Sequence, residues 1–504
     1  MKTGNYRNII SLIIFSSLIF TGCKKDKVQA PPVVIPDASV VNKFIWNGMH
    51  DYYLWSSQIP NLSEPKFGEK DTLNLLLNRF TDPQVLFTSL LYQYNTIDKW
   101  SFMVDNSQTI TDWISGTSKT AGYDYMLARI DQAGNLIGFI RYVYKNSPAE
   151  KAGLKRGNLF LKVNDQSLTI SNYQTLLAIT DTYKLGFANI TNGTIAANNL
   201  SATLTPIEMQ EDPINKDTIF VYNNQKIGYL VYNGFNSDFD LQLNNVIKTF
   251  KDANIDQMVL DLRYNGGGSV QSSTYLASML YGTDVTKVFA SSQYNAGFQA
   301  AIAEQSGSAS LNYYFANTII ATATTSSAPI NTLNLQKIYI IVSDNTASAS
   351  ELLINGLRPY MNVKVVGINT VGKYVGSMTI EDWIDNNGTV NPKDPYAMQP
   401  IVVKFANKDG VTDFINGLTP DIVASEFSQT GITADELTGI LPFGDPNEKL
   451  LKYVLADISG IPITAQTFKS GQIGMKKVMG SHDLKPFATD MYINPVKIKS
   501  SGLK

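Results

Sequence analysis

The protein is a chain of 504 residues, of which 44% are hydrophobic and 17% charged, an ordinary globular composition that suffices for roughly two to four domains. Its 41 basic and 43 acidic residues give a formal net charge of -2 at pH 7, so the chain lacks the broad basic field that nucleic-acid binding requires. The single cysteine excludes an intrachain disulfide and a cysteine-rich metal site.

Residues 1–22 have the layout of a secretory signal. Lys2 and Arg7 precede an apolar run at residues 9–20, and small residues then lead to Cys23. The run is shorter than the about 20 residues that a membrane-spanning helix needs. The sequence Phe-Thr-Gly-Cys, which ends in Cys23, resembles a bacterial lipoprotein cleavage box, in which the cysteine is acylated and becomes the new N-terminus. The alternative is an ordinary cleaved signal with an incidental cysteine.

A polar and proline-bearing segment at residues 23–38 favours an extended tether. If Cys23 is acylated, the tether holds the folded part at a membrane of the bacterial cell envelope. The sequence does not distinguish the periplasmic side from the surface side. We therefore expect a lipid-anchored envelope protein.

Residues 39–100 carry apolar and aromatic side chains at near-helical spacing, which predicts a small N-terminal helical domain. These side chains are expected to form its core. We interpret His50, a lone histidine within the pattern, as a packed or surface residue and not as a catalytic one.

The pattern changes to short strands separated by turns within residues 101–208. Strands are predicted at residues 123–130, 136–144, 159–163 and 202–206. Between them, Ser147 is placed to cap a short helix that begins at Pro148. Glu150 would complete a capping box, and Gly153 would end the helix in a left-handed turn.

The segment that begins at Ser147, Ser-Pro-Ala-Glu-Lys-Ala-Gly-Leu-Lys-Arg-Gly-Asn, resembles a PDZ domain. A PDZ domain adds a peptide strand to a sheet edge and holds its terminal carboxylate in a nest of backbone N–H groups. The resemblance implies that this peptide-binding loop comprises Gly122, Tyr123, Asp124 and Tyr125. Because Asp124 would repel a carboxylate unless it points outward, peptide binding and a purely structural or regulatory module both remain open.

Residues 209–459 are predicted to form an α/β domain. Strands are expected at residues 226–235, 257–262, 337–342 and 363–367, and helices at 241–253 and 348–360. The second strand leads into Asp-Leu-Arg-Tyr-Asn-Gly-Gly-Gly at residues 261–268. Such glycines allow close approach of a ligand to bare N–H groups, whereas their spacing matches neither phosphate-binding glycine motif.

Ser348 opens the last of these helices, and Lys373 follows the last strand. A serine hydroxyl needs a base to act as a nucleophile at neutral pH, and the two histidines, His50 and His482, lie far away in sequence. Lys373 is therefore the candidate base. Each residue alone also has a structural interpretation, since Ser348 and Glu351 form a capping box and a lysine in a glycine-flanked loop can simply be solvated.

Together these motifs resemble the carboxy-terminal processing proteases, also called tail-specific proteases. The motifs are, in order, the PDZ segment, the triple-glycine stretch, Thr-Ala-Ser-Ala-Ser-Glu at residues 346–351, Gly-Lys ending at Lys373, and Gly-Leu-Thr-Pro-Asp at residues 417–421. The resemblance implies a multi-domain α/β protein with a crotonase-like catalytic domain. It does not extend to residues 460–504, whose role is unknown and stays open between packing on the catalytic domain and bridging to a second copy.

The resemblance also implies a Ser-Lys dyad that needs no metal or cofactor. By position, Ser348 would be the nucleophile and Lys373 the general base. Backbone N–H groups of Ala349 and of Gly267 or Gly268 would hold the oxyanion. This is consistent with the positive dipole and unpaired N–H groups of a helix N-terminus.

Lysine must be neutral to accept a proton, so burial has to depress its pKa from about 10.4. Asp344 or Glu351 would raise that pKa and disable the base if either faced the amine. Where the family commonly carries a glutamine thought to orient the lysine, this chain has Ser377. Its hydroxyl can still bond to the amine, with shorter reach.

We favour a serine endopeptidase that hydrolyses unfolded or tail-exposed polypeptides through an acyl-enzyme. Two other functions remain open. A non-catalytic protein on this fold would bind peptides or apolar small molecules, and a tricorn-type peptidase would need His50 or His482 beside Ser348. The sequence predicts neither the oligomeric state nor the cleavage specificity.

Overall fold

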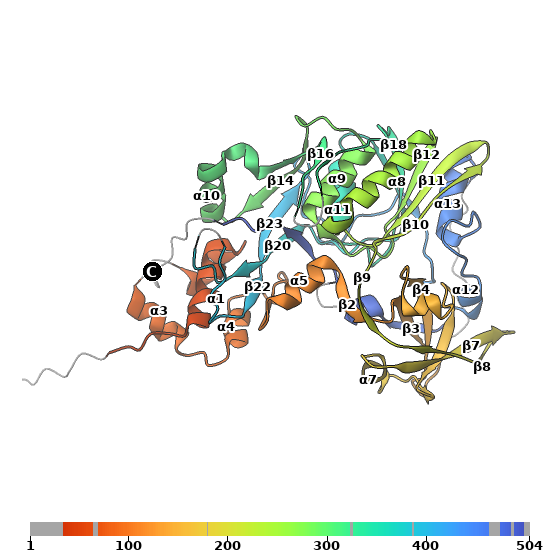
Figure 1. The fold of residues 1–504 in the computed structure, drawn as a ribbon, viewed down its shortest axis with the longest axis horizontal. Helices are drawn as coiled ribbons and strands as arrows, with labels where there is room; N and C mark the ends of the chain where they lie inside the picture. Colours follow the sequence, from red (N-terminus) through yellow and green to blue (C-terminus); the bar gives the residue numbers. More distant parts are fainter. Residues whose placement is uncertain are drawn as a thin grey trace, which may run out of the picture.

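A computed structural model describes residues 34–63, 69–178, 180–322, 326–385, 388–462, 474–484 and 488–497 (Figure 1). The predicted signal, Cys23 and most of the predicted tether lie outside the described residues. Among the described residues, no helix combines the length and the hydropathy that crossing a membrane requires.

The described residues of the N-terminal region are mainly helical, as the near-helical spacing predicts, with α1 (Val40–Tyr52), α3 (Lys70–Leu77) and α4 (Pro83–Ser89). The Asn295 side chain joins this region to the α/β part by donating 3.0 Å hydrogen bonds to the carbonyls of Asp51 and Tyr53. His50 stacks on Trp46, and its Nδ1 lies 2.9 Å from Asp51 Oδ1. This histidine is thus packed inside the helical region, as we interpreted it.

The second region is a sheet with the strand order β25-β3-β4-β5-β7-β8, at the lower right of Figure 1. Five of its strands are β3 (Tyr123–Arg129), β4 (Leu136–Val143), β5 (Leu159–Val163), β7 (Tyr183–Thr191) and β8 (Thr194–Leu204). The first three agree with the predicted strands to within one residue. The strand predicted at residues 202–206 is the end of the longer β8.

The short helix α6 (Pro148–Lys151) begins as predicted, because the Ser147 hydroxyl accepts a 3.1 Å bond from the Glu150 N–H. The Glu150 carboxylate accepts instead from the N–H of Asn146, one residue earlier than a capping box requires. Gly153 has a φ of +81°, the left-handed turn expected after this helix.

A further strand of this sheet comes from the opposite end of the chain. Strand β25 (Lys476–Gly480) pairs antiparallel with β3 and forms the edge of the sheet. It belongs to residues 460–504, whose role the sequence leaves open. The C-terminal segment is therefore part of the PDZ-like fold.

The α/β region contains a six-stranded sheet in the order β10-β11-β12-β18-β19-β24. Its strands are β10 (Ile214–Tyr222), β11 (Gln225–Tyr232), β12 (Gln257–Asp261), β18 (Lys337–Val342), β19 (Asn362–Gly367) and β24 (Ile422–Val423). All neighbours from β11 onward are parallel, whereas β10 is antiparallel. The four strands predicted from the apolar runs are all present.

Helices cover both faces of this sheet. One face carries α8 (Asp240–Asp252), α9 (Val270–Leu280) and α11 (Ala349–Leu357), and the other carries α13 (Lys449–Ile458) (Figure 1). The alternation of side chains along a strand explains the two layers. Ile338 and Ile340 of β18 pack toward the first three helices, while Tyr339 and Ile341 pack toward α13.

The carboxyl ends of parallel strands lie at the same edge of a sheet, which is where α/β proteins place their sites. The triple-glycine loop follows β12, Ser348 follows β18, and Lys373 follows β19. The topology therefore brings the three predicted site elements together.

A second sheet has the order β13-β26-β20-β23-β14-β15. Its strands are β13 (Gly268–Ser269), β26 (Met491–Ile493), β20 (Val375–Met378), β23 (Ile401–Ala406), β14 (Val288–Tyr294) and β15 (Asn312–Tyr314). Strand β26 lies between the glycine loop and β20 and is parallel to both neighbours. The C-terminal segment thus enters the α/β region as well.

Candidate active site

Ser348 is held in a conformation that costs free energy. Its φ is +67° and its ψ is -116°, values that residues other than glycine rarely adopt, at a cost of roughly 1–3 kcal/mol. The side chain is 0% exposed, and its hydroxyl has no hydrogen-bond partner among the described residues. A buried hydroxyl without a partner is unusual in a folded protein, and it is typical of a group kept free for a ligand or a reaction.

The Glu351 carboxylate fixes the serine and lysine loops together. It accepts hydrogen bonds from the backbone N–H groups of Ser348 at 2.8 Å, Gly372 at 2.7 Å and Lys373 at 2.9 Å. Burial raises the pKa of Glu351, and these bonds oppose the shift. Ser348 and Glu351 thus stand at the start of α11 in the capping-box arrangement that the sequence indicates.

Lys373 is buried beside Ser377 and faces a carboxylate. Its Nζ forms an ion pair with Oδ1 of Asp490, and it also lies 5.5 Å from the centroid of the Trp100 ring. Burial lowers the pKa of Lys373 from its usual value of 10.5, while the Asp490 charge acts in the opposite direction. No hydrogen bond joins the amine to the Ser348 hydroxyl within the described residues.

The two acids that the sequence marked as possible partners of this amine bind elsewhere. Glu351 accepts from backbone N–H groups, and Asp344 pairs with Lys477 at 2.9 Å. The acid that does contact the amine, Asp490, was missed by sequence reasoning. It lies in the C-terminal segment, 117 positions from Lys373, and no local motif marks it.

Ser377 does not contact the amine as predicted. Its hydroxyl lies 2.7 Å from Asp490 Oδ2 and accepts a 2.9 Å bond from Nε2 of Gln399. Thr379 donates in turn to the Gln399 carbonyl oxygen at 2.7 Å. The Asp490 carboxylate therefore contacts both Ser377 and the Lys373 amine.

The backbone of the glycine loop adopts a conformation that requires glycine at residues 267 and 268. Gly267 and Gly268 have φ values of +118° and +127°, and a Cβ added to Gly268 would collide with the carbonyl oxygen of Phe235. The N–H of Gly267 donates to Asn265 Oδ1 at 2.9 Å, and that of Gly268 donates to the carbonyl of Asp490 at 2.8 Å. Both predicted oxyanion donors are thus occupied in this structure.

The third predicted donor lies at the start of a helix. Ala349 is the first residue of α11, where the backbone N–H has no partner within the helix. A Cβ added to Gly267 would lie 2.7 Å from the Cβ of Ser348, so the glycine loop touches the serine. Ala349, Ser348 and the glycine loop therefore lie close together.

A cavity of about 390 Å³ borders the glycine loop. Its wall includes Phe235, Tyr264, Gly266, Gly267 and Gly268, and from the C-terminal segment His482, Ala488, Asp490 and Tyr492. Neither Ser348 nor Lys373 lines it. His482 is close to the glycine loop, since a Cβ added to Gly266 would lie 2.7 Å from its Nε2, but it makes no hydrogen bond to the Ser348 hydroxyl.

The predicted peptide-binding loop is mostly strand. Tyr123, Asp124 and Tyr125 belong to β3, and Gly122 precedes it with a φ of +82°. The Asp124 side chain is buried in an ion pair with Arg141, whose Nη2 lies 3.0 Å from Oδ2. The carboxylate is therefore neither directed to solvent nor left as an unpaired charge, which removes the repulsion that the sequence suggested.

The fold and site define a mixed α/β, multi-domain protein with a PDZ domain and an N-terminal helical domain, as predicted. Residues 226–424 match the model of peptidase family S41, residues 40–102 match the peptidase S41 N-terminal domain, and residues 139–184 match a PDZ domain. The two S41 matches together span more than half of the chain. The chain belongs to peptidase family S41, whose carboxy-terminal processing proteases it was predicted to resemble.

Individual relatives agree with this assignment. The chain is 23% identical over 325 residues to a probable CtpA-like serine protease of Staphylococcus epidermidis, a match that covers 64% of this chain and 58% of that protein. A probable CtpA-like serine protease of Staphylococcus aureus is 23% identical over 328 residues, with 63% and 56% covered. The chain therefore spans little more than half the length of the curated relatives it matches.

Among solved structures, a putative S41 protease from Bacteroides fragilis has the same fold. It matches with a TM-score of 0.65 and 24% identity, and the match covers 86% of this chain and 100% of that chain.

Proposed function

We propose that the protein is a serine endopeptidase of the carboxy-terminal processing type that uses a Ser-Lys dyad. The observation that carries the proposal is the Ser348 hydroxyl, which is buried without a partner at the N-terminus of α11. The serine backbone is strained, and the same Glu351 carboxylate holds it and the Lys373 loop. Strain and unpaired polar groups of this kind concentrate at reactive sites.

In the proposed reaction, neutral Lys373 takes the proton of the Ser348 hydroxyl as the oxygen attacks the carbonyl carbon of a peptide bond. The negative charge that develops on the carbonyl oxygen is stabilised by the N–H of Ala349 and by an N–H of the glycine loop, roughly 3 to 4 kcal/mol for each donor. The lysine then gives its proton to the departing amine. Water hydrolyses the resulting ester, with Lys373 again as the base, and the product carboxylic acid leaves.

This chemistry requires two changes from the arrangement in the structure. The Asp490 carboxylate must leave the Lys373 amine, because an ion-paired ammonium cannot accept a proton. The Asp490 carbonyl must also leave the Gly268 N–H if that group is to hold the oxyanion. The substrates that fit are unfolded or tail-exposed polypeptides. A buried nucleophile beside strands can be reached by an extended chain but not by a folded surface.

The test is labelling by a fluorophosphonate probe together with hydrolysis of an unstructured protein such as casein. We expect Ser348→Ala to abolish both and to leave the circular dichroism spectrum unchanged. Ser350→Ala is the matched control, because Ser350 is equally buried on the same helix and its hydroxyl donates to the Asn265 carbonyl instead of being free. Residual hydrolysis by purified Ser348→Ala would overturn the assignment, and failure of the intact chain to label or cleave at any pH would favour a non-catalytic binding protein.

We also propose that the chain is anchored to the cell envelope through an acylated Cys23, with the folded part on the periplasmic or surface side. The support is the lipoprotein-like box before this single cysteine. Incorporation of an alkyne-labelled fatty acid in cells would test the anchor. Loss of labelling in Cys23→Ser is expected, and persistence of the label in that variant would refute it.

A further inference from the structure

The described residues of the C-terminal segment, 474–484 and 488–497, occupy both places where this protein would hold an extended polypeptide. Its first strand, β25, lies on the open edge of the PDZ-like sheet. Its second strand, β26, lies against the glycine loop. The two strands are joined by a short stretch that carries His482 and Asp490.

On the PDZ side, β25 binds as a PDZ ligand would. It adds to β3 in antiparallel register, with Lys477 opposite Ala128 and Gly480 opposite Met126. Its Val478 and Met479 pack against the apolar cluster that includes the helix α7 (Tyr173–Leu177). Apolar side chains inserted between an edge strand and a helix are the usual mode of peptide capture by this kind of domain.

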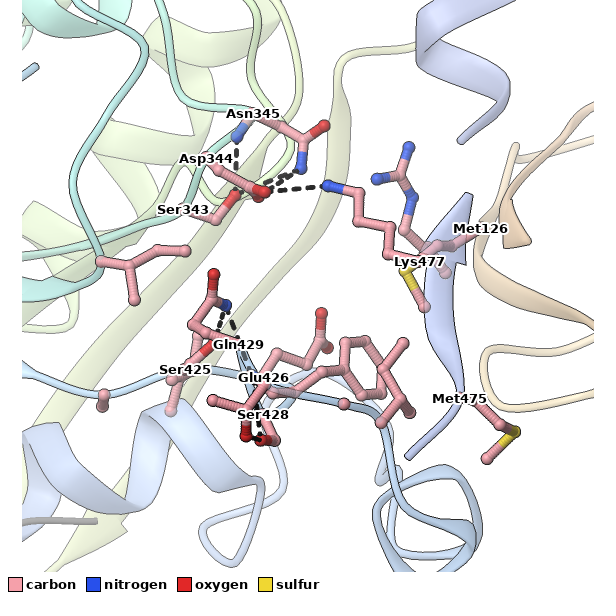
Figure 2. Close-up of a pocket in the computed structure, with 18 of the residues that line it drawn as sticks. Met126, Ser343, Asp344, Asn345, Ser425, Glu426, Ser428, Gln429, Met475 and Lys477 are labelled. Atoms are coloured by element: carbon pink, nitrogen blue, oxygen red, sulfur yellow. Dashed lines mark hydrogen bonds and ion pairs between the residues drawn. The ribbon is translucent and has the colours of Figure 1, made fainter. Parts of the chain in front are cut away.

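The downstream end of β25 points toward the predicted carboxylate nest. Ser481 follows it, and its hydroxyl accepts a 3.0 Å bond from the N–H of Tyr125 and donates to Asp124 Oδ2 at 2.6 Å. The hydroxyl thus takes the position at the beginning of β3 where the end of a bound peptide would lie. An ion pair between Lys477 and Asp344 also ties β25 to the α/β region, as Figure 2 shows across a cavity of about 290 Å³.

On the α/β side, the same segment contacts Lys373, Ser377 and Gly268 through Asp490. The Asp490 carboxylate pairs with Lys373, and the Asp490 carbonyl accepts from Gly268. A Cβ added to Gly267 would lie 2.7 Å from that carbonyl oxygen and 2.7 Å from the Cβ of Ser348, so Gly267 lies close to both the segment and the nucleophile. The Ser348 side chain is 0% exposed.

We propose that the C-terminal segment, through residues 474–484 and 488–497, is an intramolecular ligand of the PDZ groove that keeps the Ser-Lys site inactive, and that an extended polypeptide with two adjacent apolar residues releases the site by displacing β25. The proposal rests on the proposed peptidase function. Strand β26 supplies the core residues Met491 and Ile493, which are 1% and 3% exposed. Strand β26 therefore keeps the C-terminal end of the segment attached to the α/β region. After it has been displaced, β25 can bind to the PDZ groove again.

The coupling between the two ends follows from the length of the connection. Only nine residues separate Gly480 from Asp490, and Ser481 and His482 are fixed at the PDZ strand and at the glycine loop respectively. When β25 leaves its groove, the bonds of Ser481 are lost with it. The chain before Asp490 is then no longer held at the PDZ domain, and the contacts of Asp490 with Lys373 and Gly268 are weakened.

The first test is made on the full chain and does not depend on hydrolysis. A fluorescent peptide with the sequence of residues 474–484 is titrated against the intact protein and against Val478→Asp, which places a charge in the apolar groove. Lys476→Gln is the matched control on the exposed side of the same strand. We expect the peptide to bind Val478→Asp at least about tenfold more tightly than either other form. Equal binding by all three would overturn the occupied-groove proposal.

The second test is the rate of fluorophosphonate labelling of Ser348 and of casein cleavage at pH 7. We expect Val478→Asp and Asp490→Asn each to raise both rates about tenfold or more over the intact chain, with Lys476→Gln unchanged. A folded Asp490→Asn or Val478→Asp that is slower than the intact chain would overturn the proposal and make the segment part of the working site. If no form labels or cleaves while the peptide result holds, the failure lies in the proposed function, and the groove assignment stands.

Discussion

The Lys373 ammonium and the Asp490 carboxylate are in contact inside the protein, with side-chain exposures of 1% and 3%. Separating a buried ion pair of this kind is costly, because each charge would be left without its partner away from water. In the proposed mechanism Lys373 must therefore lose its contact with Asp490 before it can act as a base. The resting partner of this lysine is a residue of the C-terminal segment.

The first prediction concerns pH. Lys373 is neutral only above its pKa, so kcat/KM should rise with pH along a limb that lies below 10.5, because burial lowers this pKa. The groups that face the amine are Asp490, Asp98 and Glu351, and each raises the pKa. In Asp490→Asn the limb should therefore move to lower pH. The pH dependence of casein cleavage measures this, and an unmoved or alkaline-shifted limb would contradict the assigned base.

A second prediction concerns Glu351. Its carboxylate accepts from three backbone N–H groups and from Thr370, and an amide in Glu351→Gln can accept from only some of them. Leaving a buried N–H unpaired costs about 1–3 kcal/mol. We expect urea denaturation to show a loss of that size, together with a lower kcat. A variant with intact stability and kcat would show that Glu351 does not fix the two loops.

The third prediction separates close packing from backbone strain. Gly268→Ala should destabilise the protein and abolish activity, because the new Cβ meets the Phe235 carbonyl at a φ of +127°. Gly153→Ala is the control, since Gly153 also has a positive φ, +81°, but no atom within 4 Å of an added Cβ. That control should cost only about 1 kcal/mol and keep its activity. Thermal melts and casein cleavage would measure both variants, and equal effects would refute the role of packing.

The fourth prediction uses Asp240, which lies outside the dyad. Burial raises its pKa to about 7, although a hydrogen bond of 3.0 Å from the Ser272 hydroxyl favours the charged form. A carboxyl with a raised pKa in the folded state stabilises the fold below about pH 4, and this contribution is lost as pH rises through about 7.

Asp240→Asn carries no such charge. Compared with the intact chain, its free energy of unfolding should improve by about 1–3 kcal/mol between pH 4 and pH 8. Urea denaturation at the two pH values measures the difference. A gap between the two proteins that stays constant with pH would contradict the raised pKa.

The sequence by itself predicted most elements around the site and a candidate pair of side chains, Ser348 and Lys373. The spacing of apolar residues predicts the strands β3, β5 and β18 and the helix α11, because burial of one face of an element dictates that spacing. The motifs around Ser348 and the triple glycine can also be recognised from short stretches of sequence. A positive φ and the start of a helix each depend on a few neighbouring residues. The family followed from the order of these motifs.

The tertiary structure alone decided what surrounds that pair. Asp490, His482 and β25 come from a segment without a motif, and they reach the site only through strand pairings that join residues more than a hundred positions apart. A carboxylate has no preferred partner in a sequence pattern, because its pairing depends on which charge the fold brings within a few ångströms. The sequence therefore predicts a base at Lys373, whereas only the fold decides that this base rests against an acid.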